Sequence, residues 1–158
     1  MRLFSALRPP ADVAAEIAHA LGPRTGPLRW TDPAGWHVTL AFYGEADPVE
    51  RAGFLASALA GRKSVDVRLS GLGTFPGVLW LGVAGEGLSG LASAAGVEPG
   101  REYRPHLTLA RHARAHDPSA EAGRLAEFRS RTWTADRVEL LGGASPYRSL
   151  GSWPLLPA

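Results

Sequence analysis

The two stretches that decide the fold are His37-Val38-Thr39-Leu40 and, 69 residues later, His106-Leu107-Thr108-Leu109. On a β-strand, residues two apart point to the same face. The histidine and threonine of each tetrad are therefore predicted to share one face of a strand, and the apolar residues between them to face a core. By the same alternation Phe42 faces the core, while Ala41 and Ala110 follow on the polar face and leave open space there.

The sequence around the tetrads repeats as well. Asp47-Pro48 recurs as Asp117-Pro118 at an offset of 70 residues, and Leu69-Ser70-Gly71 matches Leu140-Leu141-Gly142 at an offset of 71. One-residue insertions in loops would give this drift. Apolar spacing and Gly/Pro stops predict the order strand–helix–strand–helix–strand in each half. The predicted segments are 2–7, 11–21, 36–43, 47–60 and 64–72, then 78–83, 85–95, 103–111, a helix from 117 and 132–141, with a closing strand at 147–155.

The repeat predicts the domain organisation. Two units this short cannot each bury a full hydrophobic face, so they are expected to pack together around a pseudo-two-fold axis. The prediction is one bilobal α+β domain over residues 1–158, with a first repeat of about 1–75 and a second of about 76–158. Two β-sheet and helix lobes then flank a central cleft.

Composition mainly excludes classes of protein. The chain has 158 residues and no cysteine, which excludes a disulfide scaffold, a zinc finger and a thiol enzyme. The formal charge of +2 does not predict an anionic ligand. Neither asparagine nor glutamine occurs, and Lys63 is the only lysine beside many arginines, a pattern typical of GC-rich coding bias. No membrane span or signal peptide is evident, so a cytoplasmic location without membrane association is expected.

The paired histidines and threonines predict a chemistry. If the axis passes between the two strands, the four side chains converge on one cleft. Two imidazoles can divide general-acid and general-base work near neutral pH, and two hydroxyls can donate hydrogen bonds to anionic oxygens. The set holds no carboxylate or cysteine, which argues against a metal hydrolase or a triad. Metal-free phosphoryl chemistry fits best, and a duplicated packing motif is the alternative.

The segments that flank the two tetrads are also distinctive. They are Arg2-Leu3-Phe4-Ser5-Ala6-Leu7, Trp36 before the first tetrad, Ala41-Phe42-Tyr43-Gly44-Glu45 after it, Leu72-Gly73-Thr74-Phe75-Pro76, Val78-Leu79-Trp80-Leu81-Gly82-Val83, Arg104-Pro105 and Ala110-Arg111. With the paired tetrads and these flanks, the chain resembles the 2H phosphoesterase superfamily, and within it the RNA 2′,3′-cyclic phosphodiesterases, also described as 2′-5′ RNA ligase-like. The resemblance covers nearly the whole sequence.

The resemblance implies hydrolysis of RNA 2′,3′-cyclic phosphate ends to 2′-phosphates, without a metal or other cofactor. It implies that His37 is the proton donor and His106 the proton acceptor, while Thr39 and Thr108 bind the phosphate. The residues alone leave the order of the two histidines open. The expected partner is RNA or a nucleotide with a 2′,3′-cyclic phosphate end, and the chain is expected to be a monomer with no obligate protein partner.

Three further residues are substrate-binding candidates. Arg104 shares the strand parity of His106 and could meet a phosphate, or it is a surface arginine at the start of a strand. Arg111 belongs to the resembled motif, but by parity it reaches the cleft only if the strand twists or bulges. Tyr43 could stack on a base at the rim of the cleft. His112 and His116 have the spacing of a helical metal pair but lack an evident third ligand.

Other functions stay open at this stage. The same site could act on another nucleotide, as a phosphodiesterase or as a reversible 2′-5′ ligase. A non-catalytic module that binds RNA ends is the alternative from another class. The compact, glycine-rich stretch 84–103 and the segment 141–147 depart from the resembled family where a substrate could bind, and this leaves the substrate open.

Overall fold

The computed structural model describes residues 1–144 and 146–158 as an alternation of strands with short helices. The strands are β1 (Arg2–Leu7), β2 (Arg29–Trp30), β3 (Val38–Glu45), β4 (Val65–Phe75), β5 (Val78–Ala84), β6 (His106–Arg111), β7 (Trp133–Ala135), β8 (Arg137–Gly142) and β9 (Arg148–Pro154). The helices are α1 (Ala11–Leu21), α2 (Pro48–Leu59), α3 (Leu88–Ala94) and α4 (Ser119–Ala122), with 3₁₀ turns η1 (Pro33–Gly35) and η2 (Gly123–Leu125).

The two longest helices form where the sequence supplies an apolar stripe and a boundary. Every fourth residue of α1 on one side is buried, and Gly22 ends the helix with a positive φ of 62°. The Asp47 side chain accepts a hydrogen bond from the Val49 amide and caps α2. The buried residues of α1 are Val13, Ile17 and Leu21.

The strands pair into one nine-stranded sheet with the order β7-β4-β5-β6-β3-β1-β8-β9, and β2 pairs with β6. The order mirrors itself about the β6–β3 contact. We call β3, β1, β8 and β9 the first lobe, and β6, β5, β4 and β7 the second lobe. One register pair, Val38 with Leu107, joins the lobes at this contact. The expected bilobal α+β architecture is therefore confirmed.

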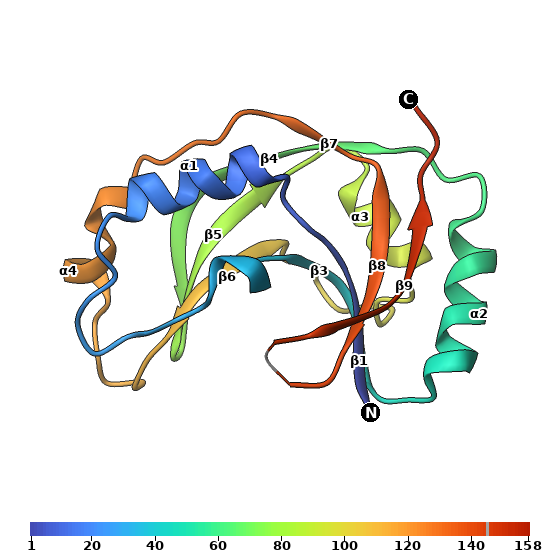
Figure 1. Ribbon diagram of the computed structural model, residues 1–158, viewed down its shortest axis with the longest axis horizontal. Coiled ribbons are helices and arrows are strands. Elements are labelled where there is room, and N and C mark those ends of the chain that lie inside the picture. Colours follow the sequence, from blue (N-terminus) through green and yellow to red (C-terminus); the bar gives the residue numbers. More distant parts are fainter. Residues whose placement is uncertain (145) are drawn as a thin grey trace.

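The lobes do not coincide with the sequence repeats. β4 belongs to the first repeat but pairs with β5 and β7 of the second lobe. β8 belongs to the second repeat but pairs with β1 of the first lobe. The helices follow this exchange: α2 packs on β9 and α3 on β3, whereas α1 contacts η2 (Figure 1). Each lobe thus contains strands from both halves of the chain.

A β-bulge in β3 changes the side-chain alternation after the first tetrad. Consecutive residues of β1 pair with Thr39 and Ala41, so Leu40 has no direct partner. Ala41 is buried as a result, while Phe42 turns to the open face with 73% of its surface exposed. Strict alternation predicted the reverse for both residues, and it is wrong because the bulge inserts one extra residue into the strand.

The second tetrad is followed by the same irregularity in β6. Consecutive residues of β5 pair with Thr108 and Ala110, so Leu109 is passed over. Ala110 is fully buried. Arg111 pairs with Val78, which has the strand parity of Trp80, the partner of Thr108. The bulge therefore returns Arg111 to the face of Thr108.

Some element boundaries differ from those predicted. The expected loop over residues 23–35 contains β2 and η1. The helix expected from residue 117 is one short turn, α4, continued as η2. The strand expected over 132–141 is divided into β7 and β8, which pair in different lobes. None of the helices in the described residues combines the length and the apolar character needed to span a bilayer.

Candidate active site

The contact between β3 and β6 brings the two tetrads together. Val38 and Leu107 are register partners in an antiparallel pair, and both are fully buried. His37 and Thr39 flank Val38, and His106 and Thr108 flank Leu107, so all four lie around this contact on the face away from the core. The structure places the four predicted residues side by side at the boundary of the lobes.

Both imidazoles are oriented by equivalent contacts. His37 Nδ1 lies 2.8 Å from the carbonyl oxygen of Gly35, and His106 Nδ1 lies 2.7 Å from that of Arg104. A carbonyl oxygen only accepts, so each Nδ1 carries the donated proton. The remaining ring nitrogen, Nε2, is then available on each histidine for proton transfer. The pseudo-symmetry of the fold thus extends to the tautomers of the two histidines.

Aromatic rings of the first lobe surround His37. The Phe4 ring centroid lies 4.9 Å from that of His37, and Tyr147 meets the same imidazole edge-to-face at 5.7 Å. Phe4 comes from β1 and Tyr147 precedes β9. These contacts restrict the imidazole to one orientation against the wall of its lobe.

His106 has a corresponding pair of aromatic neighbours in the second lobe. Phe75 meets it edge-to-face at 5.0 Å between centroids, and Trp80 lies at 5.9 Å. Gly73, the register partner of Trp80, has no side chain, and a Cβ there would collide with the indole. Because Gly73 has no side chain, the Trp80 indole can lie against β4 at this position, beside His106.

The surroundings of His37 affect its protonation. Burial lowers the pKa of His37, because the charged imidazolium loses hydration. Its bond to the Gly35 carbonyl acts in the opposite direction, and the charges of Arg8 and of a protonated His106 lower the pKa further. The net effect is a pKa below the ordinary value for histidine, so the resting His37 side chain is mostly neutral at pH 7.

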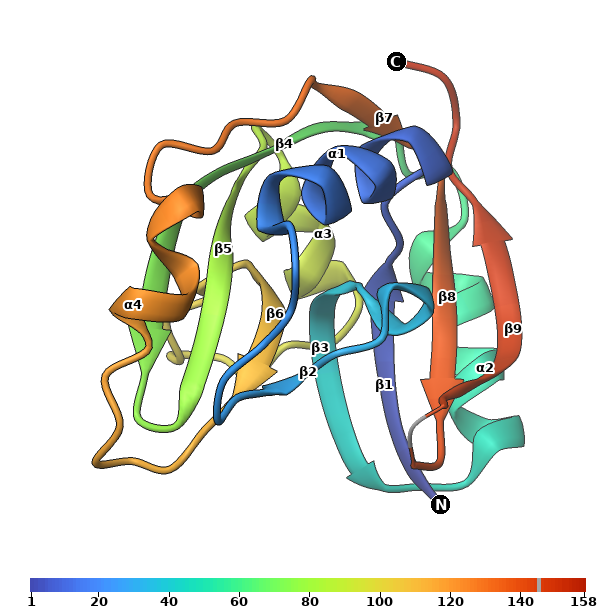
Figure 2. The same cartoon turned by 60° about the vertical axis from the view of Figure 1, so that its left-hand side comes forward.

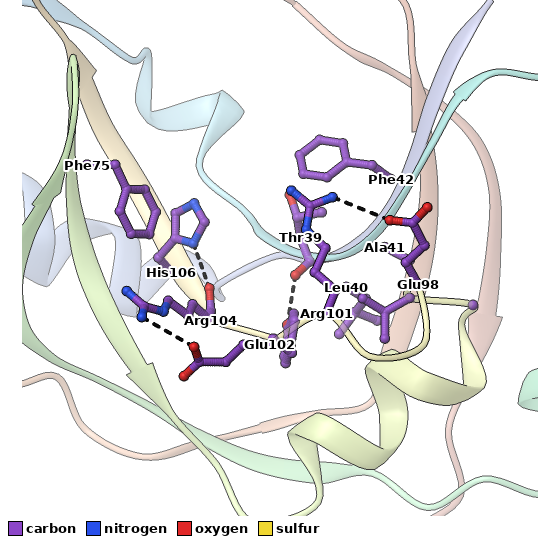
Figure 3. Close-up of a pocket in the computed structure, with 13 residues that line it drawn as sticks. Thr39, Leu40, Ala41, Phe42, Phe75, Glu98, Arg101, Glu102, Arg104 and His106 are labelled. Atoms are coloured by element: carbon purple, nitrogen blue, oxygen red, sulfur yellow. Dashed lines mark hydrogen bonds and ion pairs between the residues drawn. The ribbon is translucent and has the colours of Figure 1, made fainter. Parts of the chain in front are cut away.

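A pocket of about 450 Å³ lies beside the tetrads (Figure 3). Thr39 and His106 line it, whereas His37 and Thr108 lie outside its lining. Phe42 and Phe75 contribute aromatic walls, and β3 and the segment between α3 and β6 supply the remainder. The pocket therefore extends from the His106 and Thr39 side of the tetrads.

The segment between α3 and β6 overlaps the stretch 84–103, where a substrate was expected to bind, and contains the candidate Arg104, but its other charged residues are not among the predicted site residues. Two exposed ion pairs lie along it, Arg101 with Glu98 at 3.8 Å and Arg104 with Glu102 at 3.3 Å (Figure 3). No spacing rule relates this segment to the first tetrad. The signal that could have drawn attention to it is its density of charged residues directly before the second tetrad.

Tyr103 attaches this segment to β3. Its hydroxyl donates a hydrogen bond to the carbonyl oxygen of Thr39 at 2.7 Å. Burial raises the pKa of Tyr103 well above its ordinary value, so the hydroxyl keeps its proton. The floor of the pocket is thereby fixed to the strand that carries the first tetrad.

The three further candidates occupy different positions. Arg104 lines the pocket and is paired with Glu102. Arg111 lies on the tetrad face but outside the lining of the pocket. Tyr43 is turned away, because its hydroxyl bonds Ser5 and the carbonyl of Ala95. The bulge explains this last placement, so the prediction that Tyr43 lies at the rim of the cleft is wrong.

His112 and His116 also lie apart from the tetrads. His112 is buried, and its Nδ1 contacts the Ala113 carbonyl at 2.8 Å. His116 Nε2 bonds Glu121 at 2.8 Å. Within residues 1–144 and 146–158, no group of three or more His, Cys, Asp or Glu side chains is arranged to hold a metal ion.

Comparison with protein families relates this geometry to known proteins. A model of the 2′-5′ RNA ligase superfamily matches residues 9–144. An RNA 2′,3′-cyclic phosphodiesterase of Methanocaldococcus jannaschii is 29% identical over 124 residues, which cover 70% of this chain and 71% of the archaeal protein.

Solved structures agree with the sequence matches. The protein TT0787 of Thermus thermophilus superimposes with a TM-score of 0.77 and 25% identity, covering 98% of both chains. LigT of Escherichia coli, crystallised with 3′-AMP, superimposes with a TM-score of 0.74 and 25% identity, covering 98% of this chain and 97% of LigT.

Proposed function

Since the chain belongs to the 2′-5′ RNA ligase superfamily of 2H phosphoesterases, we propose that it hydrolyses RNA 2′,3′-cyclic phosphate ends to 2′-phosphates. The name of the archaeal relative supports a cyclic phosphodiester as substrate. The observation that carries the proposal is the pair of histidines, each with Nδ1 on a backbone carbonyl and Nε2 left for proton transfer.

The proposed step uses one histidine on each side of the phosphorus. His106 Nε2 takes a proton from water as the water oxygen forms a bond to phosphorus. The bond from phosphorus to O3′ breaks, and His37 Nε2 delivers its proton to that oxygen. The products are a 2′-phosphate and a 3′-hydroxyl. His37 can gain its proton on substrate binding, because the anionic phosphate favours the imidazolium and opposes the lowered pKa of the free site.

The threonines have the complementary role in this proposal. Thr39 and Thr108 flank the same β3–β6 contact as the histidines, so their hydroxyls can donate to the non-bridging oxygens of one phosphate. Those oxygens gain negative charge in the transition state, where fixed donors stabilise most. Arg111 shares their face and is the candidate cation for the same phosphate.

The pocket supplies a place for the nucleoside. A phosphate at the tetrads can carry its ribose and base toward the side of His106 and Thr39, where the pocket opens. Phe42, an exposed aromatic side chain on the rim, can stack on the base (Figure 3). Stacking suits RNA ends of any sequence, because every base has an aromatic face.

The test compares His37→Ala and His106→Ala on an oligonucleotide with a 2′,3′-cyclic phosphate end. Each variant is expected to lose about 10²- to 10⁴-fold in rate. His19→Ala is the matched control, because His19 is exposed on α1. Mass and nuclease mapping of the product should identify a 2′-phosphate. If both variants fold and keep the rate of the wild type, the mechanism is contradicted. If the wild-type protein binds the oligonucleotide without turnover, the RNA-end binding module is favoured.

Substrate comparison separates the remaining alternatives. Faster turnover of a cyclic mononucleotide or a 2′-5′ linked oligonucleotide than of the cyclic-phosphate RNA would reassign the substrate while keeping the chemistry. Joined strands formed in the presence of a 5′-hydroxyl RNA would indicate reversible ligation. A chelator is expected to leave the rate unchanged.

A further inference from the structure

A network of side chains lies behind His37 in the first lobe. The guanidinium of Arg8, directly after β1, contacts Glu139 of β8 with Nε 2.8 Å from the carboxylate. A terminal nitrogen of Arg8 also donates to the Ala34 carbonyl at 3.4 Å. The other carboxylate oxygen of Glu139 accepts from the Ser149 hydroxyl at 3.1 Å. The network therefore joins β1, β8 and β9 to η1.

The turn contacted by Arg8 is the one that orients His37. Ala34 and Gly35 are consecutive residues of η1, and the Gly35 carbonyl accepts from His37 Nδ1. Asp32 caps the same turn through the Ala34 amide. The contact of Arg8 with Ala34 places η1 beside the end of β1 (Figure 2). A displacement of η1 would therefore be transmitted to the His37 ring through a single hydrogen bond.

This network belongs to one lobe. At the 71-residue offset of the repeat, Glu139 of β8 corresponds to Arg68 of β4, which bonds the Ser130 carbonyl. A cation at that position cannot hold an arginine. The two histidines share their backbone contact, but this strand position carries a carboxylate in the first lobe and a cation in the second.

We propose that Arg8, held by Glu139, is a positioning residue that braces the turn behind His37 and makes its environment differ from that of His106. Arg8 acts on His37 in two ways. Its hydrogen bond supports the backbone that carries the Nδ1 acceptor, and its positive charge opposes protonation of the ring. Glu139 is 18% exposed and partly offsets that charge.

The groups around His37 determine in which direction each substitution should move its pKa. The charges of Arg8, after β1, and of His106, on β6, act on the ring directly, Glu139 on β8 is bound to Arg8, and the Tyr147 ring before β9 packs against His37. Removing the Arg8 cation should raise the pKa of His37, because a repulsive charge is lost. Removing the Glu139 anion should lower it, because the Arg8 charge is then less compensated.

The direct test is an NMR titration of the His37 ring in the full chain, with the signal assigned from a His37→Asn variant. In Arg8→Gln the midpoint should move to higher pH, and in Glu139→Gln to lower pH. Arg8→Lys keeps the charge and should leave the midpoint near that of the wild type. An unmoved midpoint in folded Arg8→Gln, or shifts of the same sign in both charge-removing variants, overturns the proposal. This test needs no substrate, so it stands even if the proposed reaction fails.

Kinetics then test the brace, and this part rests on the proposed function. Arg8→Lys cannot bond Glu139 and Ala34 in the same fork geometry, so kcat should fall about 10- to 100-fold with KM unchanged. A rise in KM without a fall in kcat would mean that Arg8 binds substrate directly, and would overturn its role as a brace. Arg137→Lys, also on β8, is the matched control and should leave both constants unchanged.

Discussion

The high exposure of the Phe42 side chain indicates a role in binding and not in folding. A large apolar side chain with 73% of its surface exposed contributes little to folding, since most of it remains in water. It lies at the rim of the pocket, 5.9 Å from Phe4 between ring centroids. An aromatic surface held in this way is suited to stack on a nucleobase.

Replacing Phe42 by Ala should therefore separate binding from stability. The free energy of unfolding should change by less than about 0.5 kcal/mol, because the ring is exposed. KM for a cyclic-phosphate oligonucleotide should rise about 5- to 150-fold, since stacking contributes about 1–3 kcal/mol per base. Urea unfolding and steady-state kinetics measure the two quantities. Phe54→Ala, an aromatic deletion on α2, is the control, and an unchanged KM in Phe42→Ala would contradict a stacking role.

At the scale of elements, the bulges and the segment before β6 shape the site more than the strands alone. The bulges turn Phe42 and Arg111 to the tetrad face. The segment between α3 and β6 forms one side of the pocket and is fixed to β3 by the hydrogen bond from Tyr103 to Thr39. The pocket thus depends on a contact between two elements that are distant in sequence.

Tyr103→Phe tests that contact. It should lower the free energy of unfolding by about 1 kcal/mol, because the Thr39 carbonyl loses a donor. It should also raise KM, since the pocket segment is no longer held against β3. Ser130→Ala removes a buried hydroxyl that bonds the Leu69 amide and the Arg131 carbonyl away from the pocket, and it should lower stability without changing KM. Equal kinetic effects of the two variants would show that Tyr103 has only a structural role.

At the scale of the whole molecule, the exchange of strands between the repeats makes the halves interdependent. β4 of the first repeat is covered by β5 and β7, and β8 of the second repeat by β1. The core likewise draws buried residues from both halves. We propose that residues 1–158 fold as one unit in which neither repeat is a domain.

The fragments 1–75 and 76–158 should each fail to fold alone, because each would expose strand edges and an apolar face. Mixed together, they should assemble and regain dispersed NMR signals. Circular dichroism and urea titration measure each state. The full chain cleaved once between β4 and β5 serves as the reference, since it contains the same two pieces already assembled. Cooperative unfolding by either fragment alone would contradict the proposal.

Much of this organisation could be predicted from the chain. The duplicated tetrads, the order of elements within each half and the pairing of histidines with threonines follow from spacing and alternation, which are local properties. Strict alternation predicts the wrong faces for Phe42, Tyr43 and Arg111, because a bulge in each strand breaks the period of two. The apolar pairs Leu40-Ala41 and Leu109-Ala110, which interrupt the alternation at equivalent positions, were the available signal.

The sequence by itself determined the duplicated strands and the chemical character of their polar face, since backbone geometry makes these depend on near neighbours only. The tertiary structure decided which strands share a lobe, which aromatic rings flank each histidine and which side of the tetrads opens into a pocket. It also placed the Arg8–Glu139 pair against the turn that orients His37. These features are contacts between residues far apart in the chain, and they exist only once the two halves have exchanged strands and packed together.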